Sequence, residues 1–217
     1  MTHPVWPIFD LRVVTPRLEL RSITDELAAG LALLAANGVH DPAYMPFSIP
    51  WTDAPSPQLE RNTMQFYWRC RADFSPTSWN LNFAVIVDGT IVGSTGLLAH
   101  DFPTLRQFET GSWLGLAHQG RGIGTEMRRA TLQLGFVGFG ARWATTGAWS
   151  DNAPSLGVTE RLGYTRTAAR RAVRRGEEHQ IVGFEMSRAH FLDSVGRDDI
   201  ELHGVAECLP MLGLDAG

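Results

Sequence analysis

Cysteine is scarce in this sequence. Cys70 and Cys208 are the two cysteines among 217 residues, and their spacing matches no metal-binding or redox motif. The seven histidines are scattered, with no pair at metal-ligand spacing. Free thiols are typical of a reducing compartment, so we expect a cytoplasmic protein that holds no metal.

Long apolar runs and a basic leader are also missing. No run approaches the ~20 apolar residues that cross a bilayer, and residues 1–7 lack the basic start and apolar stretch of a signal peptide. The formal net charge of -4 gives no general attraction to nucleic acid. We therefore expect neither a membrane nor nucleic acid among the partners.

The chain does have the material for a core, because 44% of its residues are hydrophobic. Its length suits one domain with an appendage, and we place a catalytic-type domain at residues 1–190 and a C-terminal tail at 191–217. The tail is acidic and contains glycine, and the sequence leaves open whether it docks on the domain or is poorly ordered. Homo-oligomerisation is left open too.

Patterns of apolar residues and turn signals predict an alternation of strands and helices. Alternation indicates a strand over 15–21, and Thr24 and Asp25 cap a helix that ends near Asn37. Asp88-Gly89 is a hairpin signal. The other predicted segments are helices over 58–71, 126–134 and 153–162, and strands over 81–87, 90–98, 108–116, 141–149, 164–173 and 179–186. This order predicts an α/β domain with a mixed, mostly antiparallel sheet of about seven strands flanked by helices.

Residues 40–58 differ in composition from the rest. Prolines alternate there with large apolar side chains such as Tyr44, Phe47 and Trp51. Prolines disfavour regular structure, while aromatic side chains favour burial. The segment is therefore either an ordered loop over a cavity or a plain surface cover for the core.

A glycine-rich turn lies between the strand over 108–116 and the following helix. A helix start has unpaired backbone N–H groups and the positive end of the helix dipole, and glycines let an anion approach them closely. The turn therefore predicts a pyrophosphate site, although glycines also serve ordinary tight turns. A P-loop would need a lysine, and a Rossmann turn a later acidic residue, and both are lacking. The turn consists of Gln119, Gly120, Arg121, Gly122, Ile123, Gly124 and Thr125.

Several motifs, in order, resemble the GNAT superfamily of N-acetyltransferases, and most closely its ribosomal-protein N-terminal acetyltransferase branch (RimJ- and RimL-like). Residues 15–21 resemble the first strand of that branch, 108–114 its fifth, and 119–124 its acyl-CoA pyrophosphate loop. Residues 151–155 and 160–164 match its Asn-x-x-Ser helix and the Leu-Gly-aromatic ending. The resemblance spans about residues 11–188.

The resemblance implies an acyl-CoA-dependent N-acyltransferase of the GNAT fold. The co-substrate would be acetyl-CoA, or another acyl-CoA such as succinyl-CoA, and the partner an amine acceptor. Gln119 to Thr125 would bind the pyrophosphate, Asn152 would bind the pantetheine arm, and the arm would pair with Thr95–Ala99. The N–H near Leu98 would polarise the thioester carbonyl. Ser155 would protonate the leaving thiolate.

A base must take a proton from the amine, because an amine such as lysine is protonated at neutral pH. Glu109 stands where the family strand carries its acid, and alternation places it on one face with Gly111 and Trp113. His100 and Asp101, at the end of the preceding strand, are competing bases. Asn152 can also act as an ordinary helix cap.

Arginines cluster at two places. Arg128 and Arg129 could add charge near the phosphates, but a solvated helix face is the preferred interpretation. Residues 166–175 hold five arginines, interpreted as a solvated hairpin or, alternatively, as recognition of an acidic acceptor or of a succinyl group. With no visible nucleophile motif, we expect direct attack of the amine. A non-catalytic acyl-CoA-binding module and a nucleotide-binding protein are the rival functions, and the acceptor amine stays open.

Overall fold

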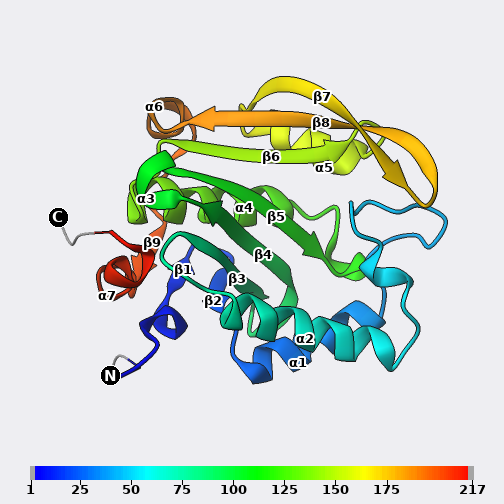
Figure 1. Ribbon diagram of the computed structural model, residues 1–217, viewed down its shortest axis with the longest axis horizontal. Coiled ribbons are helices and arrows are strands. Elements are labelled where there is room, and N and C mark those ends of the chain that lie inside the picture. The colour runs from blue at the N-terminus through cyan, green and yellow to red at the C-terminus, as the bar shows by residue number, and fades with distance from the viewer. Residues whose placement is uncertain (1–2, 215–217) are drawn as a thin grey trace.

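A computed structural model describes residues 3–214 of the chain. The described strands form one nine-stranded sheet in the order β7-β8-β6-β5-β4-β3-β2-β1-β9 (Figure 1). Neighbouring strands are antiparallel except β5 and β6, which are parallel. The strands are β1 (Arg12–Val14), β2 (Glu19–Ser22), β3 (Ser78–Val87), β4 (Thr90–His100), β5 (Gln107–Leu114), β6 (Trp143–Trp149), β7 (Thr165–Arg174), β8 (Glu177–Ser187) and β9 (Glu201–His203).

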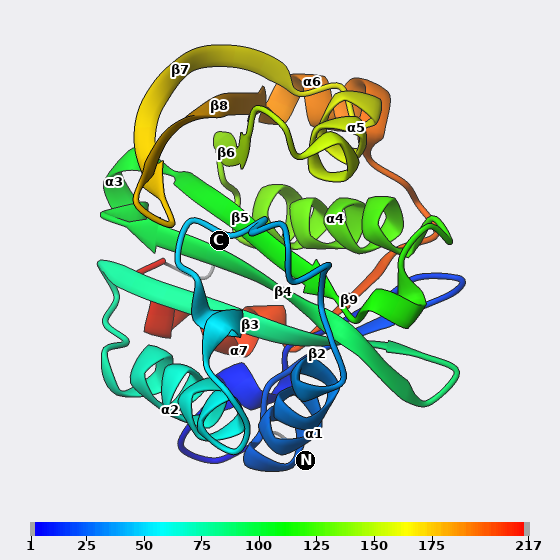
Figure 2. The same cartoon turned by 90° about the vertical axis from the view of Figure 1, so that its right-hand side faces the viewer.

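Helices cover both faces of the sheet. Figure 2 shows α1 (Asp25–Ala36) and α2 (Gln58–Ala72) below the sheet and α4 (Ile123–Gln133) and α5 (Ala153–Arg161) above it. None of the described helices is long and apolar enough to span a membrane. The short helical turns are η1 (Pro7–Asp10), η2 (Trp51–Asp53), α3 (Phe102–Leu105), η3 (Leu116–His118), η4 (Leu134–Gly138), α6 (Arg188–His190), η5 (Phe191–Val195), α7 (Val205–Cys208) and η6 (Leu209–Leu212).

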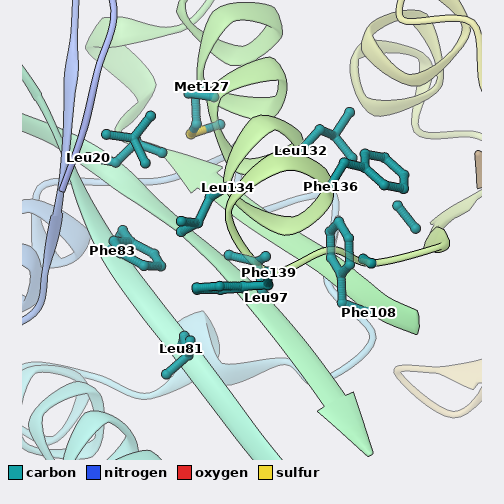
Figure 3. Close-up of a cluster of buried hydrophobic side chains, with 14 of the residues drawn as sticks. Leu20, Leu81, Phe83, Leu97, Phe108, Met127, Leu132, Leu134, Phe136 and Phe139 are labelled. Carbon is teal, nitrogen blue, oxygen red and sulfur yellow. The ribbon is translucent and has the colours of Figure 1, made fainter. Parts of the chain in front are cut away.

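The main core lies between α4 with its continuation η4 and the upper face of the sheet (Figure 3). Phe108 of β5 packs edge-to-face on Phe136, with ring centroids 5.5 Å apart. A Cβ on Gly135 would lie 2.3 Å from the Phe108 ring, so this helix can lie so close to the strand because the residue is glycine. This packing fixes α4, and with it the preceding glycine turn, against β5.

Most predicted elements are present, with bounds shifted by a few residues. Thr24 caps α1 by accepting a hydrogen bond from the Leu27 N–H, and Asp88-Gly89 turns the β3–β4 hairpin. The predicted strand over 15–21 is wrong in part, because Thr15 to Leu18 form a turn closed by the Thr15 N–H and the Leu18 carbonyl, 2.9 Å apart. The remainder of the predicted strand belongs to β2, whereas β1, which precedes the turn, was not predicted.

The tail is docked where the structure describes it. β9 pairs with β1 and adds an edge to the sheet, while Phe191, Cys208 and Leu212 are fully buried in the main core. Together with β1, this edge gives nine strands where seven were predicted. Residues 1–2 and 215–217, which belong to the predicted domain and tail, lie outside the described residues.

Candidate active site

The site begins where β5 and β6 separate. β5 pairs with β4 from Glu109 to Leu114, but it pairs with β6 only at residues 107–109, opposite 143–145. Beyond these residues the two parallel strands diverge, and β6 continues beside β8. The divergence opens a cleft of about 910 Å³.

Four parts of the chain line this cleft. They are the segment after α1, the open edge of β5, the glycine turn with the start of α4, and the corner between β6 and α5. Among the lining residues are Val39, His40, Asp41, Tyr44, Pro46, Phe47, Glu109, Thr110, Ser112, Gln119, Gly120, Gly122, Gly124, Thr125, Arg128, Thr146, Asp151, Asn152, Ser155 and Arg161.

The open edge of β5 presents backbone donors to the cleft. The Gly115 N–H donates to the Val92 carbonyl on the β4 side, so antiparallel alternation turns the N–H groups of Ser112 and Leu114 the other way. The carbonyls on this edge have partners already, because Thr146 Oγ1 donates to the Thr110 carbonyl at 3.0 Å and Gln119 Nε2 to the Leu114 carbonyl at 2.9 Å. An extended ligand with amide carbonyls would complement this edge.

The glycine turn ends in a helix start with no side-chain cap. Gly120 and Gly122 both have left-handed backbone, with φ of 72° and 77°, and Gly122 is the N-cap of α4. The N–H groups of Ile123, Gly124 and Thr125 therefore have no carbonyl of a preceding turn to bind. Together with the helix dipole they make this end of the cleft suited to an anion.

The predicted turn residues divide into lining and supporting ones. Gln119, Gly120, Gly122, Gly124 and Thr125 line the cleft. The Ile123 side chain is buried in the main core, and Arg121 is exposed, with its carbonyl accepting from Arg17 at 3.1 Å. Both can therefore act at the site through their backbone.

Arg161 joins this end of the cleft and was missed by the sequence analysis. Its NH1 donates to Thr125 Oγ1 at 3.3 Å, on the first turn of α4. Arg17 lies on the other side of the turn, where its Nε is 3.2 Å from Glu126 Oε2. Arg161 therefore adds positive charge at the uncapped helix start, whereas the charge of Arg17 is neutralised by Glu126. The motif over residues 160–164 predicted that Arg161 lies at the end of a helix. It did not indicate that the guanidinium turns toward the glycine turn.

The expectation for Leu98 needs correction. Leu98 lies in β4, opposite Asn80 of β3 and Glu109 of β5, so its strand is hydrogen-bonded on both sides. It does not belong to the residues that line the cleft. The open strand is β5, which immediately precedes the glycine turn, so the edge free to pair with a ligand is that of β5, with the Ser112 N–H, and not that of residues 95–99.

Glu109 is an exposed residue of the cleft wall. The competing candidates lie elsewhere: His100 is bound to Ser78 Oγ at 3.1 Å, and Asp101 begins α3, and neither lines the cleft. Asp41 and Asp151 also line the cleft. The sequence analysis named neither of them as a candidate base. Asp151 is a poor base, because Arg174 lowers its pKa to about 2.

Asn152 and Ser155 lie together at the start of α5. Asn152 Oδ1 accepts a hydrogen bond from the Ser155 N–H at 3.2 Å, which confirms the helix-capping interpretation. Both residues also line the cleft. Because Oδ1 is occupied by the cap, the amide NH₂ of Asn152 is the group that can donate to a ligand.

Residues 39–53, which we call the cover segment, cross one end of the cleft and reach the tip of the β7–β8 hairpin (Figure 2). Trp149 Nε1 donates to the Phe47 carbonyl at 3.1 Å, and Gln119 Nε2 to the Val39 carbonyl at 2.7 Å. The segment is therefore an ordered loop over a cavity, as one of the two interpretations predicted.

Two hairpin arginines fasten the cover segment. Arg174 pairs with Asp151 at 2.5 Å and lies against the Tyr44 ring, 5.1 Å from its centroid. The Tyr44 hydroxyl donates to Asp151 at 3.0 Å, and burial together with Asp151 raises the pKa of Tyr44 to about 12. Arg175 pairs with Asp53 at 2.6 Å. The solvated-hairpin interpretation is wrong for Arg174, which is 8% exposed.

Arg128 also departs from its expected place. It was interpreted as part of a solvated helix face, but it is 6% exposed and lines the cleft from below. Its NH2 donates to Ser112 Oγ at 3.2 Å and its NH1 to Thr146 Oγ1 at 3.4 Å, so it bridges the two diverging strands. No group of three His, Cys, Asp or Glu suited to a metal occurs among residues 3–214.

Comparison with known proteins identifies the family of this chain and several proteins of similar structure. The model of a GNAT acetyltransferase domain matches residues 17–165. RimJ from Mycobacterium smegmatis, solved with CoA-disulfide, is 20% identical with a TM-score of 0.66, over 87% of this chain and 93% of that one. RimL, a ribosomal L7/L12 alpha-N-protein acetyltransferase solved with coenzyme A, is 17% identical with a TM-score of 0.64, over 80% and 96%. An acetyltransferase of the GNAT family from Bacillus anthracis is 18% identical with a TM-score of 0.65, over 82% and 99%.

Proposed function

Because the chain belongs to the GNAT acetyltransferase family, we propose that it transfers a short acyl group from acyl-CoA to a primary amine. The amine nitrogen attacks the thioester carbonyl carbon, forming a C–N bond. The C–S bond breaks, and its electron pair leaves with sulfur as the CoA thiolate. The amine loses one proton and the thiolate gains one, so the products are an amide and free CoA.

The cleft supports this proposal through one observation above the others. An edge of β5 with outward N–H groups runs directly into an uncapped helix start. The first feature suits the amides of a pantetheine arm, and the second suits a pyrophosphate. The cofactor would therefore lie along β5, with its phosphates at Gly120 to Thr125 and its thioester near Ser112, whose N–H would polarise the carbonyl.

Three side chains supply the remaining tasks. Glu109, on the wall of the cleft, would accept the proton of the amine directly or through water. The Asn152 amide would hold the pantetheine arm, and the Ser155 hydroxyl would donate to the departing thiolate. A thiol pKa of about 8.5 makes this last proton transfer a modest aid.

The class of acceptor is inferred from the chemistry of the reaction, which needs an amine, and from the proteins of similar structure. RimL is described as acting on a ribosomal protein, so a protein α-amine is the first candidate, with lysine side chains and small amines beside it. A cytoplasmic location stays a prediction.

The test is amine-dependent release of free CoA thiol. An acyl-CoA panel is combined with three acceptor peptides that differ only in their amines: one with a free N-terminus and no lysine, one acetylated at its N-terminus with one lysine, and one acetylated with no lysine. The proposal predicts thiol release only with an amine present. Binding of CoA without amine-dependent release would instead make the protein a CoA-binding module.

A further inference from the structure

A buried guanidinium with no carboxylate partner lies at the bottom of the cleft. Arg128 is on the second turn of α4 and is 6% exposed. An arginine side chain stays charged at any pH a protein tolerates. The ion pairs among residues 3–214 do not include Arg128. Its protein partners are the hydroxyls of Ser112 and Thr146, which carry no charge.

Such an arrangement leaves a charge to be neutralised. A buried ion without a counter-ion costs several kcal/mol. The Nε atom of Arg128 is buried and has no hydrogen-bond partner, while the residue lines the cleft. A ligand anion would supply both the missing charge and the missing acceptor.

Two hydroxyls lie close to the Arg128 guanidinium. Tyr164 is buried in the main core, where its phenol lies against Arg128 and Thr110, and Thr110 lines the cleft beside Arg128. Burial raises the pKa of Tyr164, whose phenol is close enough to Arg128 to feel its charge. The phenol therefore keeps its proton and supports Arg128 and Thr110 from the side of the core. The guanidinium and the Thr110 hydroxyl, which belong to residues that line the cleft, form a set of donors suited to a carboxylate.

The position of this set excludes the acceptor amine as the source of the anion. Phe108 of β5 faces α4, and strand alternation places Thr110 and Ser112 on that same face. Glu109 lies on the opposite face together with Trp113, which packs on Trp51 of the cover segment at 5.7 Å. An amine that meets Glu109 thus approaches from the face that Arg128 does not occupy.

The phosphates are excluded as well. The donors suited to a pyrophosphate lie at the helix start and beside Arg161. Arg128 is a full turn further along α4, and it binds Ser112 of β5, where the proposed function places the thioester. Its guanidinium therefore lies near the thioester end of the cofactor site and not near the phosphate end.

We propose that the acyl group itself carries a carboxylate, as in succinyl-CoA, and that Arg128 binds this carboxylate together with Thr110, both of which line the cleft. The inference rests on the proposed function, since it places an acyl-CoA along β5. It also replaces the hairpin arginines as the anchor of a succinyl group, because Arg174 is already paired with Asp151.

Calorimetric titration with CoA, butyryl-CoA and succinyl-CoA tests the proposal. Butyryl and succinyl chains have the same number of carbons and differ in the carboxylate. The protein should bind succinyl-CoA at least ~10-fold more tightly than butyryl-CoA, since a tenfold ratio corresponds to one good charged contact. Arg128→Met should bring this ratio near one, whatever its effect on the affinity for CoA itself, and Arg128→Lys should keep part of it.

Arg170→Met is the matched control, because Arg170 is an exposed arginine of the hairpin that does not line the cleft. It should keep the full succinyl preference. Equal affinity of the parent protein for succinyl-CoA and butyryl-CoA overturns the inference and leaves the proposed function intact, and this result needs no variant. Equal weakening of all three ligands by Arg128→Met also overturns it. Failure to bind CoA at all contradicts the proposed function instead.

Discussion

At the scale of residues, the candidate general bases differ in whether they line the cleft and in whether they are held in an ion pair. Glu109 lines the cleft without an ion-pair partner among residues 3–214, whereas Asp151 is held by Arg174. Asp101 and His100 lie beyond the lining residues. Among the sequence candidates, Glu109 is therefore the carboxylate able to receive a proton from a ligand in the cleft.

Glu109→Gln should lower turnover by about a hundred- to ten-thousand-fold, the usual contribution of a general base. The affinity for acyl-CoA should not change, because Glu109 acts on the amine. The loss should shrink as pH rises toward the pKa of the amine, about 8 for an α-amine and about 10.4 for lysine. Rate profiles against pH measure this, and the pH at which the loss shrinks also identifies the type of amine.

Asp101→Asn and Asp41→Asn are the controls for this substitution. The first changes a carboxylate outside the cleft and should leave turnover at the parental level. The second changes another lining carboxylate. Parental turnover in Glu109→Gln with a large loss in Asp41→Asn would move the base to the cover segment.

The sequence predicted the local structure of residues that belong to a motif. It did not predict the orientation of side chains that depends on packing. Gly120 and Gly122 occupy the left-handed backbone that the turn requires, which a glycine pattern signals directly. Asn152 caps its helix as its position predicts. Arg128 and Arg161 could not be assigned, because an arginine near a helix surface gives no sign of whether its guanidinium turns toward solvent or toward a cleft.

At the scale of elements, the cover segment owes its place to the β7–β8 hairpin. Arg174 contacts Tyr44 and Asp151 together, and Arg175 holds Asp53. The lowered pKa of Asp151 means that its carboxylate stabilises this contact fully above about pH 4 and loses the stabilisation as pH falls toward 2. The cover segment thus stays fastened at neutral pH.

Arg174→Met should lower the free energy of unfolding by about 1–3 kcal/mol, the range for hydrogen bonds to charged groups. It should also raise the KM for the amine more than it lowers kcat, because the cover segment loosens while Glu109 and Ser112 stay in place. Denaturant unfolding and steady-state kinetics measure the two effects.

Arg171→Met is the comparison, since Arg171 is exposed and stands 3.9 Å from Glu178. Surface changes of this kind are worth within about 0.5 kcal/mol. Indistinguishable stability and KM in the two variants would show that Arg174 does not fasten the segment.

The choice of the pairing strand shows where element prediction fails. The motif resemblance pointed to residues 95–99, but a sequence does not reveal which strand edge stays unpaired. In the structure β4 has neighbours on both sides, whereas β5 loses its partner after Glu109. Sheet order is a property of long-range pairing, so it appears only with the fold.

At the scale of the whole molecule, the site depends on the order of the strands in the sheet, because the cleft opens where β5 and β6 diverge. The α/β architecture, the helices on both faces and the hairpins follow from periodicity and turn residues. The docking of the tail does not, because a three-residue strand such as β9 carries little pattern. The tail is held by the pairing of β9 with β1 and by Phe191, whose ring stacks on that of Phe136 with centroids 4.9 Å apart.

The central claim is that CoA is held with its pyrophosphate on the turn between β5 and α4. Calorimetric titration of CoA into the parent, Gly122→Leu and Gly89→Leu tests it most directly. Both glycines have left-handed backbone, with φ of 77° and 75°, so both substitutions carry similar strain. Gly89 lies in the β3–β4 hairpin, outside the cleft lining. We predict that Gly122→Leu weakens CoA binding at least ~100-fold, about 2.7 kcal/mol, while Gly89→Leu binds like the parent. Parental affinity in a folded Gly122→Leu protein would contradict the claim.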